Sequence, residues 1–135
     1  MYKNILVTIA LDHAHDSANT LAIARALAAE GASITALNVL EEIPAYVSQY
    51  LPNDNSQNRH SNAEAELKAA LASAAGVRPV VVSGHAGTTI VDYAREHAID
   101  CIVIASHRPG LQDYFLGSTA SRVVRHAPCA VHVIR

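Results

Sequence analysis

The run Asn4-Ile5-Leu6-Val7-Thr8-Ile9-Ala10-Leu11 decides the fold. It is almost entirely apolar and rich in β-branched residues, which is typical of a strand that is covered on both faces in a parallel sheet. Four later runs have the same character, namely Ser33–Leu40, Pro79–Val82, Cys101–Ala105 and Ala130–Ile134. We therefore predict five strands.

Helical patterns separate these strands, and each begins at a hydroxyl or acidic side chain that can cap a helix. The predicted starts are Asp16 or Ser17, Ser61, Thr88 or Thr89, and Ser118. The first helix has an apolar stripe that includes Ala28, and the helix is predicted to end at Gly31. The second helix runs to about Ala75, the third carries Ala98, and the last ends at His126. Residues 41–62 are predicted as a long polar excursion. This alternation predicts a three-layer α/β domain with right-handed crossovers.

Composition indicates an ordinary globular protein. The chain has 135 residues, half of them apolar, so we expect one domain over residues 1–135. The net charge is −2 and only Lys3 and Lys68 are lysines, which argues against nucleic acid as the main partner. No apolar run reaches the roughly 18 residues of a membrane span, and no export leader precedes the first strand. We therefore expect a cytoplasmic protein without a membrane partner. Cys101 and Cys129 lie in or beside apolar runs and are expected to be reduced thiols.

The ligand crevice of an open parallel sheet lies at the carboxyl ends of its strands, where neighbouring connections leave on opposite faces. Gly117-Ser118-Thr119 begins the last helix, and the free N–H groups at a helix start can hold an anion. His107 and Arg108 follow the fourth strand and can supply positive charge to a phosphate. Two alternatives remain open: Ser118 merely caps the helix, and His107 and Arg108 belong to a solvated loop.

Three segments of the last third of the chain carry a resemblance to a known family. They are IVIASHRP at 102–109, YFLGSTA at 114–120 and VVRHAPCAV at 123–131. The sequence resembles the universal stress protein family over nearly the whole chain, and most of all its small bacterial F and G types. The resemblance implies a Rossmann-like domain of the adenine nucleotide alpha hydrolase type, with five parallel strands in the order 3-2-1-4-5.

Many members of that family bind ATP through the motif G-x2-G-x9-G-[ST]. In this chain the last glycine and the hydroxyl of the motif correspond to Gly117 and Ser118. Ala105 and Arg108 stand in the places of the first two glycines, and eight residues instead of nine separate Arg108 from Gly117. Because the F and G types share these departures, the resemblance implies a variant pocket.

The resemblance also implies which residues contact the base and the phosphates of the nucleotide. It implies that the backbone of Val39 fixes adenine, that Ile9 and Ala10 wall the base, and that Thr119 joins Gly117 and Ser118 at the phosphates. The family usually has an aspartate at the end of strand one, where this chain has Ala10, and Asp12, two residues further on, is the candidate to take its place in the nucleotide site. Any Mg²⁺ would be held mainly by phosphate oxygens.

No set of nucleophile, base and orienting acid stands out, and the phosphate-loop lysine motif is absent. His13 and His15 can point to one side of an extended segment but lack a third ligand, so no protein metal site is predicted. We therefore predict a chain that is not an enzyme.

The last strand predicts a homodimer. Val131 and Val133 alternate with His132 on a strand expected at a sheet edge, which would otherwise leave its backbone unpaired. The resemblance implies pairing of this strand with its copy across a two-fold axis.

The leading interpretation is thus a dimeric stress-response regulator that binds ATP or another adenine nucleotide and acts through an unidentified regulatory protein partner. Two alternatives remain: an interaction dimer that has lost nucleotide binding, and, ranked lowest for want of a general base, a slow ATP hydrolase.

Overall fold

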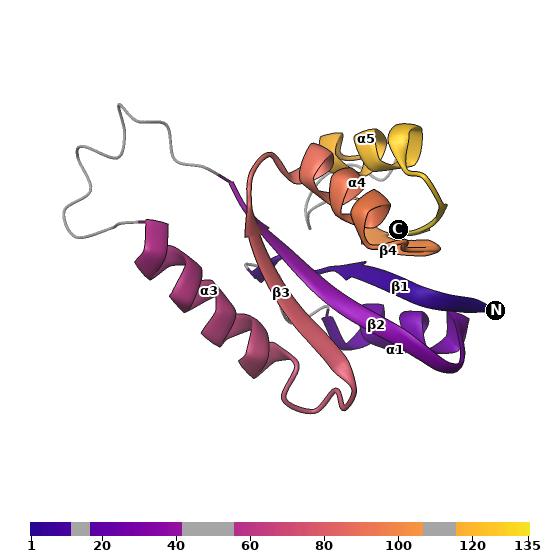
Figure 1. Cartoon of the computed structure of the whole chain (residues 1–135), viewed down its shortest axis with the longest axis horizontal. Helices are drawn as coiled ribbons and strands as arrows, with labels where there is room; N and C mark the ends of the chain where they lie inside the picture. The colour runs from indigo at the N-terminus through magenta and orange to yellow at the C-terminus, as the bar shows by residue number, and fades with distance from the viewer. Residues whose placement is uncertain (12–16, 42–55, 107–115) are drawn as a thin grey trace.

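The computed structural model describes residues 1–11, 17–41, 56–106 and 116–135. Its centre is a five-stranded sheet in the order β3-β2-β1-β4-β5, in which every neighbouring pair is parallel (Figure 1). The strands are β1 (Tyr2–Thr8), β2 (Ala28–Leu40), β3 (Val77–Ser83), β4 (Cys101–Ala105) and β5 (Ala130–Ile134). The predicted parallel sheet and its strand order are confirmed.

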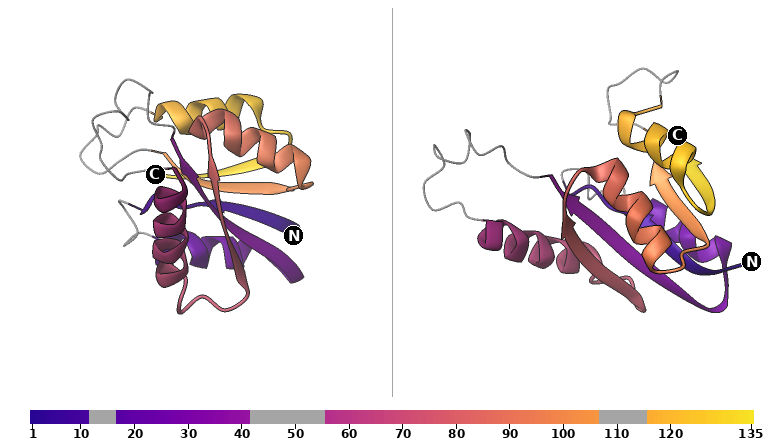
Figure 2. Two further views of the ribbon diagram at one scale, coloured as in Figure 1. Left: turned by 60° about the vertical axis from the view of Figure 1, so that its left-hand side comes forward. Right: turned by 45° about the horizontal axis from the view of Figure 1, so that its top comes forward.

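Helices cover both faces of the sheet. The described helices are α1 (Ser17–Leu27), α3 (Ser56–Ala70), α4 (Ala86–Glu96) and α5 (Ser118–His126). Figure 2 shows α4 and α5 on one side and α1 on the other. Leu21 of α1 and Leu67 of α3 belong to one hydrophobic cluster, whereas Ile90 of α4 and Val123 of α5 belong to a second. The sheet therefore separates two cores, which gives the predicted three layers.

The central strands are buried because both of their faces are covered. Ile5, Leu6 and Val7 of β1 have no exposed surface, and Cys101 to Ile104 of β4 are all buried. Asp100 aligns the beginnings of these two strands, since its carboxylate accepts the N–H groups of Lys3 at 2.8 Å and Asn4 at 3.0 Å. The backbone N–H groups of Lys3 and Asn4, near the beginning of the central strand, are therefore hydrogen-bonded.

The structure corrects the predicted ends of the first strand and helix. β1 ends at Thr8 rather than Leu11, and α1 ends at Leu27, so Ala28 belongs to β2 and not to the stripe of the helix. The reason is pairing with β1: Tyr2 pairs with Ala28, and the register shifts before Asn4 pairs with Ser33. Gly31, with φ +77, lies inside this irregular part of β2. The candidate cap Asp16 lies outside the described residues.

Other predicted boundaries move as well. α3 begins at Ser56, so Ser61 lies inside the helix instead of capping it, and the helix ends at Ala70 rather than Ala75. The early start is compatible with polar residues because Ser61 and Asn62 face solvent. β3 is longer at both ends than predicted. The predicted bounds of β4, α5 and β5 are confirmed.

α4 begins at Ala86, before the predicted Thr88 or Thr89. The turn that precedes it needs a glycine: Gly84 has φ +150, and a Cβ there would collide with Oγ1 of Thr89. At the other end Ala98 has φ +53 and follows the helix instead of continuing it.

Both cysteines are free thiols, as predicted, with Cys101 buried and Cys129 half-buried. Burial is the main cause that raises the pKa of Cys101 from 9.0 to about 11, and Cys129 and Asp100 nearby add to it. All described helices fall short of the length and apolar character that a membrane-spanning helix needs.

Candidate functional site

The ends of β1 and β4 form the point where the winding of the sheet reverses. After β1 the chain enters α1, which packs in one core, and after β4 it leads to α5, which packs in the other. Pairing between β1 and β4 runs from Ile5 with Cys101 to Val7 with Val103 and then stops, although β4 continues to Ala105. Strands that separate at such a reversal leave a crevice in which ligands of α/β proteins bind.

The beginning of α5 lies beside the end of β4. The N–H of Gly117 donates to the carbonyl of Ser106 at 2.6 Å, which ties the helix start to the residue after β4. Gly117 is the N-cap, with φ −58 and ψ 158, and no side chain caps the helix. Ser118 is the first helical residue and is exposed, so it does not act as the cap. The first-turn amides of α5 therefore have no carbonyl within the helix to bond.

The ends of β1 and β2 lie on the other side of this reversal. The N–H of Ile9 donates to the carbonyl of Leu37 at 2.9 Å, which keeps Ile9 against β2 beyond the end of β1. Ile9 is buried and Ala10 is exposed. Val39 is half-buried and packs against the same core as Leu116, the residue before Gly117.

Asn38 is a site candidate that the sequence analysis missed. Its Nδ2 donates to the carbonyl of Ile9 at 2.8 Å, which links the ends of β1 and β2. Its Oδ1 is buried and has no hydrogen-bond partner in the described part of the chain. A buried acceptor without a partner costs free energy, so such an atom often marks a place for a missing donor. A lone amide within the apolar run of β2 was the available signal.

The structure thus connects part of the predicted site. Ile9, just after β1, is hydrogen-bonded to Leu37 and Asn38 of β2, and Val39 is the next residue of that strand. Ser106, which follows Ala105, accepts the N–H of Gly117. Ser118 is exposed and Thr119 is half-buried on the first turn of α5. The predicted site residues Asp12, His107 and Arg108 lie outside the described residues.

The chemistry of these residues suits an uncharged wall and an anion more than a metal. The described residues 9–11, 105–106 and 116–120 include no carboxylate or imidazole. Among all described residues, no group of three histidine, cysteine or acidic side chains could hold a metal ion. His13 and His15 lie outside the described residues.

The open parallel sheet with its reversal point and helices on both faces defines a class, the Rossmann-like α/β domain. The profile of the Universal stress protein family matches residues 1–135. The chain therefore belongs to the universal stress protein family. The finer resemblance to the F and G types stays a prediction.

Individual relatives agree with this assignment. A universal stress protein of Thermus aquaticus is 29% identical over 139 residues, covering 100% of both chains. One of Methanothermobacter thermautotrophicus is 34% identical over 58 residues, which are 43% of this chain and 40% of that one. The solved structure of universal stress protein UspA from Lactobacillus plantarum has a TM-score of 0.69 at 32% identity and covers 99% of this chain and 98% of that one.

Two further solved structures contain nucleotides. The universal stress protein from Archaeoglobus fulgidus in complex with dAMP has a TM-score of 0.63 at 19% identity and covers 99% of this chain and 98% of that one. A universal stress protein in complex with cAMP has a TM-score of 0.65 at 17% identity, with 99% and 97% covered. At these identities the likeness concerns the fold.

Proposed function

We propose that this chain binds ATP or another adenine nucleotide at the ends of β1, β2 and β4. The observation that carries the proposal is the uncapped beginning of α5 at Gly117, directly beside the reversal point of the sheet. Open first-turn amides and the positive end of the helix dipole attract phosphate. The nucleotide complexes of other family members support the choice of ligand.

The base would lie against the ends of β1 and β2. Ile9, Ala10 and Val39 offer an apolar wall, and the backbone of Val39 can select adenine by hydrogen bonds. The unpartnered Oδ1 of Asn38 adds an acceptor to this wall. A ligand amino group that reached this atom would satisfy it, which suits adenine better than a base without an amino group.

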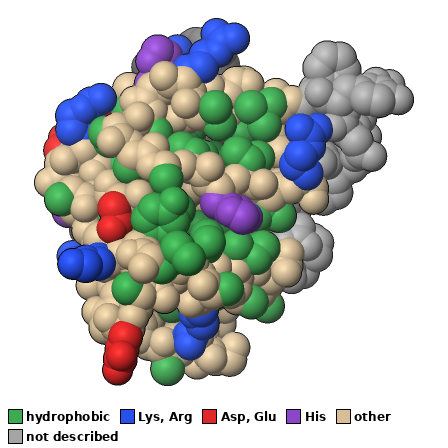
Figure 3. Space-filling model, turned by 90° about the vertical axis from the view of Figure 1, so that its right-hand side faces the viewer, with side chains coloured by type: hydrophobic (Ala, Val, Ile, Leu, Met, Phe, Trp, Pro, Cys, Tyr) green, Lys and Arg blue, Asp and Glu red, His purple; other side chains and the backbone are tan. Residues whose placement is uncertain are grey.

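We further propose that β5 joins two copies of the chain. β5 is an edge strand, and no described strand pairs with its free side. The carbonyl of Ile134 accepts the N–H of Ser106 at 2.8 Å and so faces inward, which turns the backbone groups of Val131 and Val133 toward the free side. His132 is exposed between these half-buried valines. Figure 3 shows one face of the molecule, on which hydrophobic side chains gather among scattered charged ones.

The second candidate function is an interaction dimer without nucleotide, favoured by Ala10 in place of the family's usual aspartate. Calorimetric titration of the purified protein with ATP, ADP, AMP and cAMP separates the two. If the chain binds nucleotide, the titration should show saturable binding of at least one of the four. Absence of binding to all four, with no nucleotide released on denaturation, would leave the interaction dimer.

The phosphate position is tested by Gly117→Val and Gly117→Ala. The φ and ψ of Gly117 are accessible to any residue, so both variants should fold with an unchanged melting temperature. The larger side chain should obstruct close approach of phosphate and weaken ATP binding at least about tenfold, a loss of about 1.4 kcal/mol. Alanine should cost less than valine. Unchanged affinity in a folded Gly117→Val protein would overturn the phosphate assignment.

We propose binding without turnover. The remaining candidate, slow ATP hydrolysis, would require phosphate release that persists through repeated purification and falls in Ser118→Ala or Arg108→Ala.

A further inference from the structure

The backbone of Val39, near the end of β2, faces the side on which β1 ends. The carbonyl of Leu37 accepts the N–H of Ile9 at 2.9 Å, so Leu37 directs its backbone groups toward β1. Every second residue of a strand directs its backbone groups to the same side, so Val39 faces that side too. In agreement, the carbonyl of Leu40 accepts the N–H of Gly84 at 2.9 Å and therefore faces β3.

Val39 lacks its normal backbone partners on the β1 side. A continued ladder would pair the N–H of Val39 with the carbonyl of Ile9. Nδ2 of Asn38 donates to that carbonyl instead, at 2.8 Å. Among the described residues, the N–H of Val39 forms no hydrogen bond with Ile9, and its carbonyl forms none with Leu11. Asn38 thus ends the ladder early and leaves one donor and one acceptor of Val39 unpaired.

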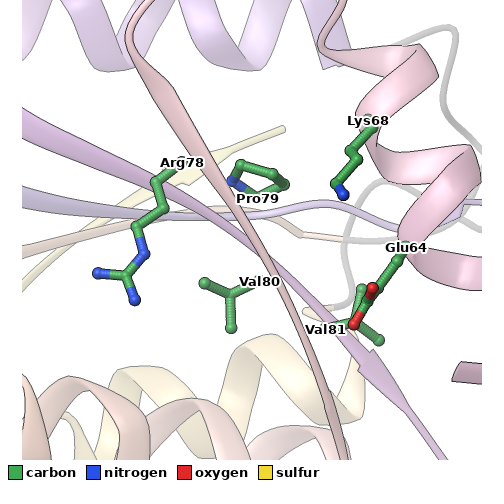
Figure 4. Close-up of a pocket in the computed structure, with 6 residues that line it drawn as sticks. All are labelled: Glu64, Lys68, Arg78, Pro79, Val80 and Val81. Atoms are coloured by element: carbon green, nitrogen blue, oxygen red, sulfur yellow. The ribbon is translucent and has the colours of Figure 1, made fainter. Parts of the chain in front are cut away.

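The side chain of Asn38 lies on the α3 face of the sheet. Asn38 is in register with Val81 of β3, and paired residues of neighbouring strands direct their side chains to the same face. Figure 4, a close-up of the cavity of about 270 Å³ between α3 and β3, shows Val81 toward Glu64 of α3 and Val80 on the other side of the strand. The amide therefore covers the end of β1 from one face, while the unpaired groups of Val39 lie in the plane of the sheet.

Stability alone does not account for an asparagine at this position. Asn38 is 7% exposed, and its Oδ1 has no hydrogen-bond partner in the described part of the chain. The amide cannot be reversed to pair this atom, because Oδ1 would then lie against the carbonyl oxygen of Ile9. A leucine of similar shape would leave no unpaired acceptor and would let the ladder continue to Val39. The amide is better explained by the groups that it leaves open.

We propose that Asn38 is a positioning residue that makes the nucleotide site selective for adenine, a role that rests on the nucleotide site proposed above. The N–H and the carbonyl that it leaves open on Val39 present a donor and an acceptor side by side. Adenine has the matching pair on its Watson–Crick edge, with N1 as acceptor and the 6-amino group as donor. Hypoxanthine has a 6-oxo group and a protonated N1, which reverses the pattern and leaves both groups of Val39 unpaired.

The open donor can be tested without nucleotide. Hydrogen exchange of the Val39 amide, followed by NMR, should be at least about tenfold slower in Asn38→Leu than in the unmodified protein, because the amide can then bond to Ile9. Asn38→Ala makes the same comparison if leucine is not accommodated. Thr35→Val, which removes another buried polar side chain of β2, should leave the exchange unchanged. Equal exchange in the unmodified protein and both Asn38 variants would overturn the role of Asn38, whether or not nucleotide binds.

Selectivity is tested by calorimetric titration with ATP and inosine triphosphate, which differ only at the Watson–Crick edge of the base. The unmodified protein and Thr35→Val should prefer ATP by at least about tenfold, and this ratio should fall to about threefold or less in Asn38→Leu and Asn38→Ala. A merely structural role would weaken both nucleotides equally, so an unchanged ratio would overturn the proposal even if ATP binds. Binding of neither nucleotide would overturn the proposed function and the selectivity with it, while the exchange of the Val39 amide would still report whether Asn38 holds this donor open.

Discussion

The two edges of the sheet differ in how their free backbone is treated. β3 contains Pro79, which removes an N–H donor from the free side, and Nε2 of His60 contacts the carbonyl oxygen of Val81. β5 contains no proline, and no described strand or helix contact covers the outward groups of Val131 and Val133 in the way that His60 covers Val81. An unpaired edge invites association with another strand. The comparison therefore indicates that one edge is protected and the other is left for a partner.

This asymmetry has a consequence for assembly. A chain with one open edge can form a closed dimer across a two-fold axis, whereas a chain with two open edges can continue into longer assemblies. If β5 pairs with its copy as proposed, protection of β3 would limit the assembly to a dimer. In this view α3 is part of the control of assembly as well as a cover for the core.

The largest expected effect concerns the inner side of the β5 edge. Cys101 of β4 pairs in register with Ala130 of β5, and its side chain is buried in the cluster that contains Leu21 of α1. The raised pKa of Cys101, about 11, reduces its thiolate at pH 8 about hundredfold relative to an ordinary thiol of pKa 9.0. Alkylation by iodoacetamide, followed by peptide mass spectrometry, should be slower by at least that factor.

The same pKa shift affects stability. Because burial favours the neutral thiol, its contribution is full below about pH 9 and is lost as pH rises toward 11. Urea unfolding midpoints should fall over that interval, and less so in Cys101→Ala. Rapid alkylation of Cys101 in the native protein would mean that the core around β4 opens, and would contradict the burial of this thiol.

A proline at β5 should reproduce there the protection seen at β3. Val133→Pro removes an outward N–H, and the two-fold axis doubles the loss. We expect the dissociation constant of the dimer, measured by sedimentation velocity, to rise at least about tenfold. Val133→Thr is the matched control because it keeps the N–H and the β-branched shape. Equal dissociation constants for the two variants would place the dimer interface elsewhere.

The sequence was sufficient for the fold because the apolar runs are long and the alternation is regular. β4, α5 and β5 were predicted with their observed bounds since apolar runs, Pro128 and the start at Ser118 mark them clearly. The end of α1 was missed because Ala28 suits a helix as well as a strand, and only its pairing with Tyr2 decides between them. A local sequence pattern does not contain the pairing with a distant strand that decides whether such a residue is helical or extended.

The candidate site likewise contains residues that the local sequence predicts and residues that only the folded chain reveals. Gly117 and Ser118 could be found from a motif, because the motif records local backbone geometry at a helix start. Asn38 offered only a lone amide in an apolar run as a signal, because its significance depends on the carbonyl of Ile9, 29 residues away, and on an acceptor left without a partner after packing. The contact of His60 with Val81 could not be predicted either, because it joins a helix and a strand whose distance from each other the sequence does not reveal.

The smallest expected effect comes from opening the protected edge. Pro79→Val restores an outward N–H on β3, and His60→Ala frees the carbonyl of Val81, so the double variant would present a donor and an acceptor on the free side. α3 still lies alongside, which limits access. We therefore expect only about a threefold increase in species larger than the dimer at a fixed protein concentration, as hydrogen bonds of about 1 kcal/mol allow. Pro128→Ala, at an exposed proline that precedes β5 and lies outside both edge strands, should leave the distribution unchanged. If the double variant behaves like Pro128→Ala in sedimentation velocity, Pro79 and His60 do not protect the edge, and α3 alone accounts for the difference between β3 and β5.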